Sequence, residues 1–327
     1  MNQTSQGDDL RSTAAETGRK RLVGAVVVAL VLLLVALLAV WVGQTQAKEP
    51  AAGPIPSTPP VSTTVALVTD FGNCDEGEAQ VAAMVDAWDP EAIASAGDNT
   101  QGLEDCVPYT DSVDDYYSDY TRDPSGPRFW PALGNHDIEN EGSGLAVYRD
   151  YFTYLPTDAD PQGRWYDKTL GSVHFFVLDS EASDADLAAQ RVWLKGALAT
   201  ARAEEPATWN IVMFHRPAHS SGTHGEFAPL RESSGWDYQA WGADIVVAGH
   251  QHIYEDVLVD GLHHVTAGVG ASDIARTCPT TRVAGSRVCL DGPGAMRLTA
   301  TPATLILEYH QPVDGSDVVT DVITLDR

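Results

Sequence analysis

Residues 65–72 read Val65-Ala-Leu-Val-Thr-Asp-Phe-Gly72, a short apolar run that ends in an aspartate and a glycine. A buried strand that feeds directly into a loop has this pattern. The same pattern predicts further buried strands at 92–97, 129–133, 173–178, 210–214 and 244–248. The sequence therefore predicts a sheet core whose strands end in polar loops.

Two segments between these strands place their apolar residues on one helical stripe, at 76–88 and at 183–202. Ser183 is a typical N-cap for the second of them. From Tyr254 on, the helical pattern stops and short strands are predicted at 256–259, 263–267, 296–299, 304–309 and 318–325. Because alternating strands and helices give way to antiparallel strands, we expect a mixed α/β fold.

Polar residues of metal-ligand type follow five of the predicted strands, most of them beside a glycine. They are Asp70, Asp98, Asn135 with His136 and Asp137, His215, and His250 with His252. Side chains at the carboxyl ends of α/β strands converge on one crevice. Carboxylates and an amide oxygen mixed with imidazoles suit Fe, Zn or Mn better than Ca or Mg. Two such ions clamp a phosphoryl group and lower the pKa of a bound water.

The order Asp70-x-Gly72, Gly97-Asp98, Gly134-Asn-His-Asp137, Val212-x-x-His215 and Gly249-His-x-His252 resembles the calcineurin-like metallophosphoesterases, in particular their purple acid phosphatase branch. The resemblance runs from about Val65 to the C-terminus and implies a four-layer α/β/β/α sandwich around two sheets. Residues 190–194, with Gln190, Trp193 and Leu194, also look like the family.

The resemblance also implies roles for individual residues. Asp70, Asp98 and His252 would hold a first metal, and Asp98, Asn135, His215 and His250 a second, with Asp98 bridging. His136 would lie over the leaving group and help to protonate it. His224 lies where related phosphatases place a histidine on the substrate side.

One position departs from the family pattern. Gln101 stands where the purple acid phosphatases carry tyrosine, and Gly72 stands where other members carry histidine. Tyr109, Tyr116, Tyr117, Asp105 or a water remains open as the missing ligand of the first metal. Without a tyrosine on iron, no purple colour is expected.

The sequence gives weaker support for a functional role of several other residues. His219 and Arg216 are secondary candidates for the site, whereas His174, His263, His264 and His310 lie in strand-like runs and are expected to be structural. The stretch 109–120 is acidic and aromatic. It is interpreted as a solvated helix rather than as a cleft wall, because its apolar residues recur at helical spacing.

The 327 residues carry 20 Lys and Arg against 46 Asp and Glu, a net charge of −26. The 43% hydrophobic content excludes a disordered chain. The acidity argues against nucleic acid as a partner, because affinity for phosphate backbones comes mainly from Lys and Arg. A small phosphoester remains possible as substrate, because bound metal ions invert the local charge.

The N-terminal part predicts a membrane anchor. Residues 1–21 form a polar cytoplasmic stub, 22–43 an uncharged apolar span of transmembrane length, 44–63 a Pro-rich linker and 64–327 the metallophosphoesterase domain. A long, cleaved signal peptide is the alternative. Because the cluster Arg19-Lys20-Arg21 stays in the cytoplasm, either reading exports the domain, as a single-pass cell-membrane protein or a secreted one.

Four cysteines lie in the predicted exported part and allow three pairings. Cys278 and Cys289 flank one loop and are expected to close it, which leaves Cys74 to pair with Cys106. A thiolate metal site is the alternative, but no CxxC spacing is present, and an oxidising compartment favours disulfides.

The combined expectation is an extracytoplasmic two-metal phosphatase acting on phosphate monoesters through a metal-activated water. Two alternatives remain open. The same site might serve phosphodiesters, or the absence of the tyrosine marks a degenerate binding or scaffold domain that keeps one metal.

Overall fold

The computed structural model describes residues 61–327 except 104–105, 107–108 and 140–143. Two sheets form its centre. The first contains β1 (Thr63–Val68), β2 (Ala92–Ser95), β3 (Phe129–Pro131), β11 (Ala295–Ala300), β12 (Thr304–Val313) and β13 (Ser316–Asp326). The second contains β4 (Tyr166–Leu170), β5 (Val173–Val177), β6 (Trp209–Met213), β7 (Ile245–Ala248), β8 (Tyr254–Val259), β9 (Leu262–Ala267) and β10 (Ser286–Leu290).

The strand order is β13-β12-β11-β1-β2-β3 in the first sheet and β10-β8-β9-β7-β6-β5-β4 in the second. Strands β1, β2 and β3 run parallel, and so do β5, β6, β7 and β9. The remaining pairs are antiparallel. Each sheet therefore has a parallel part whose strands end on the same edge.

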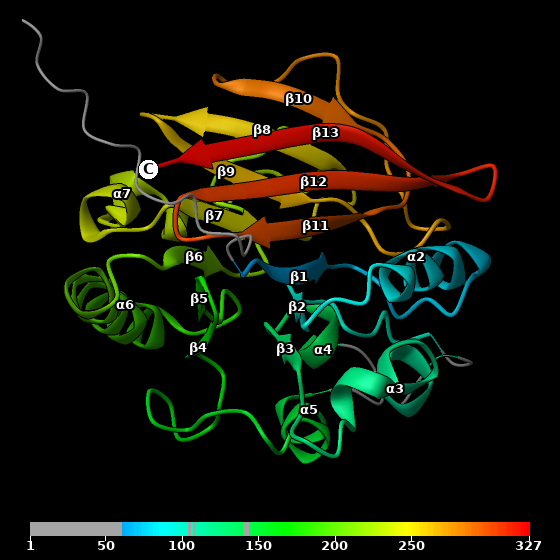
Figure 1. The fold of residues 1–327 in the computed structure, drawn as a ribbon, viewed down its shortest axis with the longest axis horizontal. Helices are drawn as coiled ribbons and strands as arrows, with labels where there is room; N and C mark the ends of the chain where they lie inside the picture. The colour runs from blue at the N-terminus through cyan, green and yellow to red at the C-terminus, as the bar shows by residue number, and fades with distance from the viewer. Residues whose placement is uncertain (1–60, 104–105, 107–108, 140–143) are drawn as a thin grey trace, which may run out of the picture. The chain divides into compact units, whose positions relative to one another are not determined.

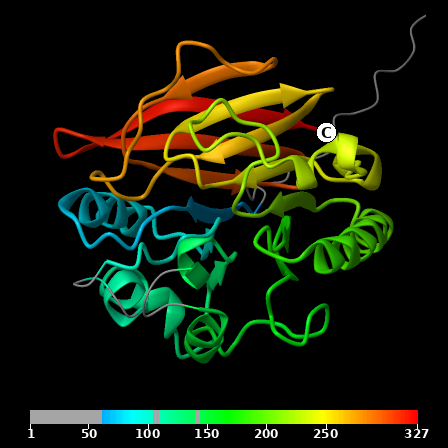
Figure 2. The same ribbon diagram turned by 180° about the vertical axis from the view of Figure 1, so that it is seen from behind.

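The helices are α2 (Glu76–Ala87), a π-helical turn η1 (Thr110–Asp114) that continues as α3 (Asp115–Thr121), α4 (His136–Glu139), α5 (Leu145–Tyr151), α6 (Asp184–Glu204), α7 (Tyr238–Trp241) and the 3-10 turns η2 (Ala228–Leu230) and η3 (Glu232–Ser234). Helices α2 and α3 lie beside the first sheet and α6 beside the second (Figures 1 and 2). Ser183 caps α6 by accepting a hydrogen bond from the Asp186 backbone N–H, as its sequence predicts.

Side chains of the second sheet alternate between two cores, because successive strand residues point to opposite faces. Phe175 and Ile211 pack with residues of the first sheet. Phe176 and Val212 pack with Leu194 of α6 and its neighbours. The predicted mixed α/β fold with two sheets is confirmed.

The predicted strands and helices end within two residues of the observed ones, except that β12 continues four residues further, to Val313. Strands β4 and β10 and helix α5 were not predicted, because their residues are largely polar or half-buried at the edges of the fold. β1 begins at Thr63, which the sequence places in the linker, and Thr63 pairs with Ala300.

Both predicted disulfides are present. Cys74 pairs with Cys106, and Cys278 pairs with Cys289. Within the part of the chain that the structure describes, no helix has the length and apolarity of a membrane span. The predicted span at 22–43 and its linker up to residue 60 lie outside the described residues.

The stretch 109–120 is helical, as expected, and it is amphipathic rather than solvated all round. Tyr109, Val113 and Tyr117 are buried in the core, whereas Asp115 and Asp119 are exposed. The prediction of a helix with a solvated acidic face is therefore confirmed.

Candidate metal centre

The six predicted metal ligands lie on loops that leave parallel strands of both sheets. Asp70 follows β1, Asp98 follows β2 and Asn135 follows β3 in the first sheet. His215 follows β6, and His250 and His252 follow β7 in the second. Because these strands end on the same edge, their loops meet above the junction of the sheets.

Asp70, Asp98 and His252 form what we call the first cluster, in which one potential ligand atom from each lies within 4.8 Å of the others. The His252 Nε2 atom is 3.1 Å from Asp70 Oδ1. The His252 Nδ1 atom is 2.9 Å from the Ile274 carbonyl oxygen, to which it donates as N–H. That hydrogen bond leaves Nε2 as the ring nitrogen available to a metal.

The second cluster joins the same Asp98 to His215, His250 and Asn135. Potential ligand atoms of Asp98, His215 and His250 again lie within 4.8 Å of one another. The His215 Nε2 atom is 3.2 Å from Asp98 Oδ2 and 3.3 Å from Asn135 Oδ1. His215 Nδ1 faces the Ala96 carbonyl oxygen at 2.9 Å, which directs Nε2 into the cluster.

One oxygen of each central carboxylate faces a histidine ring nitrogen but, in the part of the chain that the structure describes, accepts no hydrogen bond. Asp70 Oδ1 and Asp98 Oδ2 are buried and, within the described residues, accept no hydrogen bond. Their other oxygens are occupied, since Asp70 Oδ2 accepts from the His250 backbone N–H and Asp98 Oδ1 from that of His136. A buried charge without a partner is costly. The donor set of carboxylate, amide oxygen and imidazole therefore fits two cations, with Asp98 as a ligand in both clusters.

Burial and the close approach of charged side chains shift the pKa values of these ligands in the metal-free protein. Burial raises the pKa of Asp70, but the facing His252 outweighs burial and holds that pKa well below its usual range. Burial lowers the pKa of His215, but Asp98 outweighs it and raises the pKa to about 10. Burial and then the neighbouring His215 lower the pKa of His250 to about 2, so its imidazole is neutral.

Four of the six predicted ligands have left-handed backbone conformations. The φ angles are 50° at Asp70, 51° at Asp98, 71° at His250 and 54° at His252. Such conformations are unfavourable for residues other than glycine and persist where the surroundings enforce them, often at functional sites. The loops thus hold these side chains in orientations that ordinary turns do not provide.

Two glycines let the loops approach closely. A Cβ atom at Gly72 would lie 2.6 Å from the Thr100 Cα atom, and Gly72 has a φ of 76°. A Cβ at Gly134 would lie 2.2 Å from the Asp98 backbone nitrogen. The histidine that other family members carry at the Gly72 position has no room here.

Two buried carboxylates hold the loops without belonging to either cluster, and the sequence alone does not single them out for this role. Asp137 accepts hydrogen bonds from the backbone N–H groups of Asn99 and Gly134 and from the Tyr109 hydroxyl. Burial and then the Asp98 charge raise the pKa of Asp137 to about 7. Glu78 accepts from three successive backbone N–H groups, at residues 72–74.

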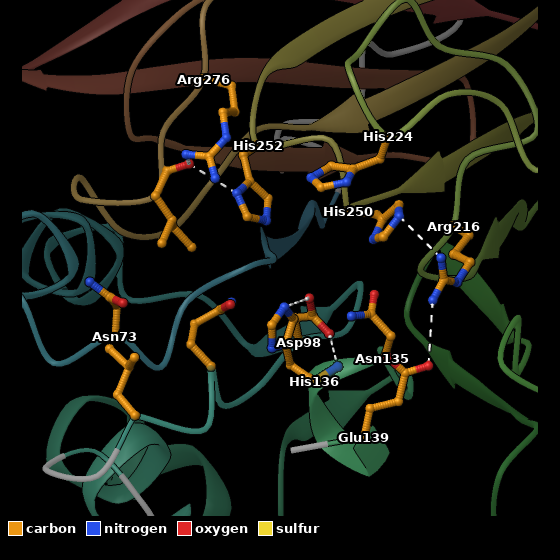
Figure 3. Close-up of a pocket in the computed structure, with 13 residues that line it drawn as sticks. Asn73, Asp98, Asn135, His136, Glu139, Arg216, His224, His250, His252 and Arg276 are labelled. Carbon is orange, nitrogen blue, oxygen red and sulfur yellow. Dashed lines mark hydrogen bonds and ion pairs between the residues drawn. The ribbon is translucent and has the colours of Figure 1, made fainter. Parts of the chain in front are cut away.

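A cavity of about 460 Å³ opens beside the clusters. Its lining residues are Asn73, Asp98, Gln101, Leu103, Asn135, His136, Glu139, Arg216, His224, His250, His252, Ile274 and Arg276. Figure 3 shows Asp98, Asn135, His250 and His252 facing this space. Asn73, Glu139 and Arg276 are lining residues that sequence reasoning missed, because no motif marks them.

The predicted catalytic histidines both line the cavity. His136 Nε2 is 4.0 Å from Asp98 Oδ2. The His224 ring lies 4.7 Å from the His250 ring and 5.7 Å from the His252 ring, between centroids. Burial and the neighbouring His252 lower the pKa of His224. Arg216 also lines the cavity, and the Glu181 carboxylate holds its guanidinium at 2.7 Å.

Gln101 occupies the expected place beside the first cluster. It is buried, lines the cavity and donates from Nε2 to the Phe71 carbonyl oxygen at 3.2 Å. None of Tyr109, Tyr116 and Tyr117 is among the described residues that line the cavity. The cavity lining thus gives no support for these tyrosines as the missing ligand, and Asp105 lies outside the described residues.

Three of the four histidines expected to be structural pair with carboxylates on neighbouring strand residues. His174 lies 2.7 Å from Asp167, and His263 lies 2.7 Å from Asp256. His310 lies 2.5 Å from Asp317. The fourth, His264, has a different environment, described below.

A two-sheet α/β fold whose strand ends carry two ligand clusters that share one aspartate has the donor arrangement of a dinuclear metal centre. A family model described as calcineurin-like phosphoesterase matches residues 63–254. The chain belongs to this family, and its sequence resembles the purple acid phosphatase branch.

Two similar proteins fit this assignment. An uncharacterized protein of Mycobacterium tuberculosis is 31% identical over 158 residues, which cover 43% of this chain and 30% of that protein. Purple acid phosphatase 23 of Arabidopsis thaliana is 31% identical over 129 residues, or 37% of this chain and 28% of that enzyme. The aligned part thus spans less than a third of the length of these relatives.

A solved structure has the same fold. A dimetal phosphatase from Danio rerio superposes with a TM-score of 0.56 at 13% identity, covering 82% of this chain and 99% of that one.

Proposed function

We propose that this protein hydrolyses phosphate monoesters outside the cytoplasm. The observation that carries the proposal is the Asp98 carboxylate, which belongs to both clusters and also borders the cavity. A phosphoryl group in that cavity would lie beside residues of both clusters. Asp70, Asp98, Asn135, His215, His250 and His252 would hold the ions. When bound, the ions supply Lewis-acid charge to the phosphoryl oxygens and acidify water.

The chain's own side chains supply positioning and proton transfer. His136 is half-buried at the cavity wall, and its backbone N–H is tied to Asp98 Oδ1 at 2.8 Å. This hydrogen bond positions the His136 imidazole so that it can donate a proton to the leaving oxygen of the ester. His224, whose pKa is lowered, offers a neutral imidazole to the substrate on the opposite side.

The charge around the cavity favours monoesters. Arg216 and Arg276 both line it and add two cations to those of the metals. A monoester presents three terminal phosphoryl oxygens to such groups, whereas a diester presents two and must also accommodate a second substituent. The net charge of −26 on the whole chain disfavours anionic polymers, so small soluble phosphoesters are the proposed substrates.

The proposed location rests on two features. The uncharged run at 22–43 has the length of a membrane span, and basic residues precede it. Both disulfides belong to the part that would be exported, and such bridges persist in oxidising compartments.

The direct test is hydrolysis by the purified full chain after removal of metals and reloading with Fe, Zn or Mn. We expect metal-dependent cleavage of p-nitrophenyl phosphate, with slower cleavage of bis(p-nitrophenyl) phosphate. Faster cleavage of the diester would establish the phosphodiesterase alternative. No cleavage of either compound by a folded protein with bound metal would overturn the proposal in favour of a binding or scaffold domain.

A further inference from the structure

A second group of metal-ligand type lies outside the metal centre. His219, Glu232 and His264 place one potential ligand atom each within 4.8 Å of the others. The three residues come from separate segments: the loop after β6, the turn η3 and the strand β9. The His219 Nε2 atom is 2.6 Å from Glu232 Oε2, and the His264 Nε2 atom is 3.2 Å from Glu232 Oε1.

His264 is the unusual member of this group. Its side chain is 3% exposed, and neither ring nitrogen makes a hydrogen bond within the described part of the chain. The 3.2 Å contact of Nε2 with Glu232 thus lacks hydrogen-bond alignment. A buried polar group left without a hydrogen bond costs about 1–3 kcal/mol. A cation between Nε2 and the carboxylate would bind both atoms at once.

His219 has the orientation of a supported metal ligand. Its Nε2 faces Glu232, while its Nδ1 lies 3.5 Å from Glu226 Oε1. Arg231 in turn holds the other Glu226 oxygen at 2.9 Å. A carboxylate behind the second ring nitrogen is the arrangement that fixes the orientation of metal-bound histidines.

Comparison with the other buried histidines separates this group from ordinary pairs. His174, His263 and His310 each have a carboxylate of their own within 2.7 Å. His219 and His264 instead both face the carboxylate of Glu232, with ring centroids 4.8 Å apart. Burial also lowers the pKa of His264, which keeps its lone pair available.

We propose that His219, Glu232 and His264 bind a zinc ion, separate from the two ions of the metal centre. Two imidazoles and one carboxylate are a common zinc donor set, in which neighbouring donor atoms lie about 3.3 Å apart. Glu232 is 34% exposed, so solvent completes the coordination. The ion would join the loop that carries His224 to strand β9 and stabilise the cavity wall from behind.

The proposal is tested by counting zinc in the full chain with the metal centre disabled. Asp98→Asn combined with His250→Ala removes a ligand from both clusters and serves as the background. This background is stripped of metal with chelator and then titrated with zinc against a chromophoric indicator. We expect it to bind one zinc ion tightly. Adding His264→Gln should abolish that binding.

The matched control is His263→Gln in the same background. His263 is the next residue on β9 but points to the opposite face and pairs with Asp256, so this variant should retain the ion. If His264→Gln does not fold, Glu232→Gln at the half-exposed position gives the same comparison. No bound zinc in a folded background, or equal binding with and without His264, would overturn the proposal. Neither result depends on turnover of the native enzyme.

Discussion

The second cluster, around His215, and the first cluster, around His252, are built from the same kind of strand-end loop but differ in completeness. The second cluster has four side chains, contributed by Asp98, Asn135, His215 and His250. The first has three, and the neutral Gln101 stands where the family tyrosine would add an anionic oxygen. We therefore expect tight binding of the second ion and weaker, more exchangeable binding of the first. Asp98 couples the two sites.

The largest effect is expected from Asp98→Asn, which removes the shared charge. Both ions should be lost, and turnover should fall by about a thousandfold or more, because the phosphoryl group loses its electrostatic stabilisation. The asparagine oxygen still accepts the hydrogen bond from the His136 backbone N–H, so the fold should persist. Metal analysis and a thermal melt check both statements. Asp256→Asn, at a buried carboxylate paired with His263, should keep both ions.

His250→Ala should break only the second cluster. We expect the metal centre to hold one ion instead of two and turnover to fall by about a hundredfold or more, because one cation no longer stabilises the reacting phosphoryl group. The matched comparison is His224→Ala, which should lower turnover while both ions remain, since His224 lies at the cavity and in neither cluster. Unchanged turnover of His250→Ala would contradict the two-ion assignment.

Metal binding at the second cluster should depend on pH. Because Asp98 raises the pKa of His215 to about 10, this imidazole is protonated in the metal-free protein at neutral pH. Metal binding requires its neutral form, so the second ion must displace a proton. Its affinity should fall about tenfold for each pH unit below about 10. Calorimetry in buffers of different ionisation enthalpy measures the released proton, and an absence of proton release would refute this expectation.

The smallest expected effect is a gain at the first cluster. Gln101→Tyr should place a phenol oxygen where the side chain now borders the cavity, tightening the first ion about tenfold and giving a visible absorption band with iron. Gln101→Phe supplies the ring without the oxygen and should do neither. If the tyrosine variant shows no change in affinity or colour, another group already completes the first site.

Much of the metal centre could be predicted because the ends of its strands can be recognised in the sequence. Apolar runs ending in Asp70, Asp98 or His215 mark both the strand and its loop, and parallel strands bring such loops together. The supporting residues could not be predicted in the same way. Asp137 and Glu78 act on backbone groups of other loops or turns, and such contacts depend on distances that appear only after folding.

The fold shows the same division. Central strands such as β6 are fully buried and mostly apolar and were predicted, whereas the edge strand β4 has polar residues at its three central positions and was not. The environment of His264 was also missed. Its strand-like sequence context predicted a structural histidine. Only the three-dimensional structure shows that His264 lies beside His219 and Glu232 and that neither of its ring nitrogens makes a hydrogen bond within the described residues.

The most direct test of the two-ion centre is anomalous diffraction from crystals of the zinc-loaded full chain. At the metal centre we predict two strong peaks beside Asp98, about 3.5–4 Å apart, with the peak beside His215 and His250 at the higher occupancy. These two are separate from the peak expected at His219, Glu232 and His264. A single peak at the metal centre, or two peaks there that do not share Asp98, would contradict the account.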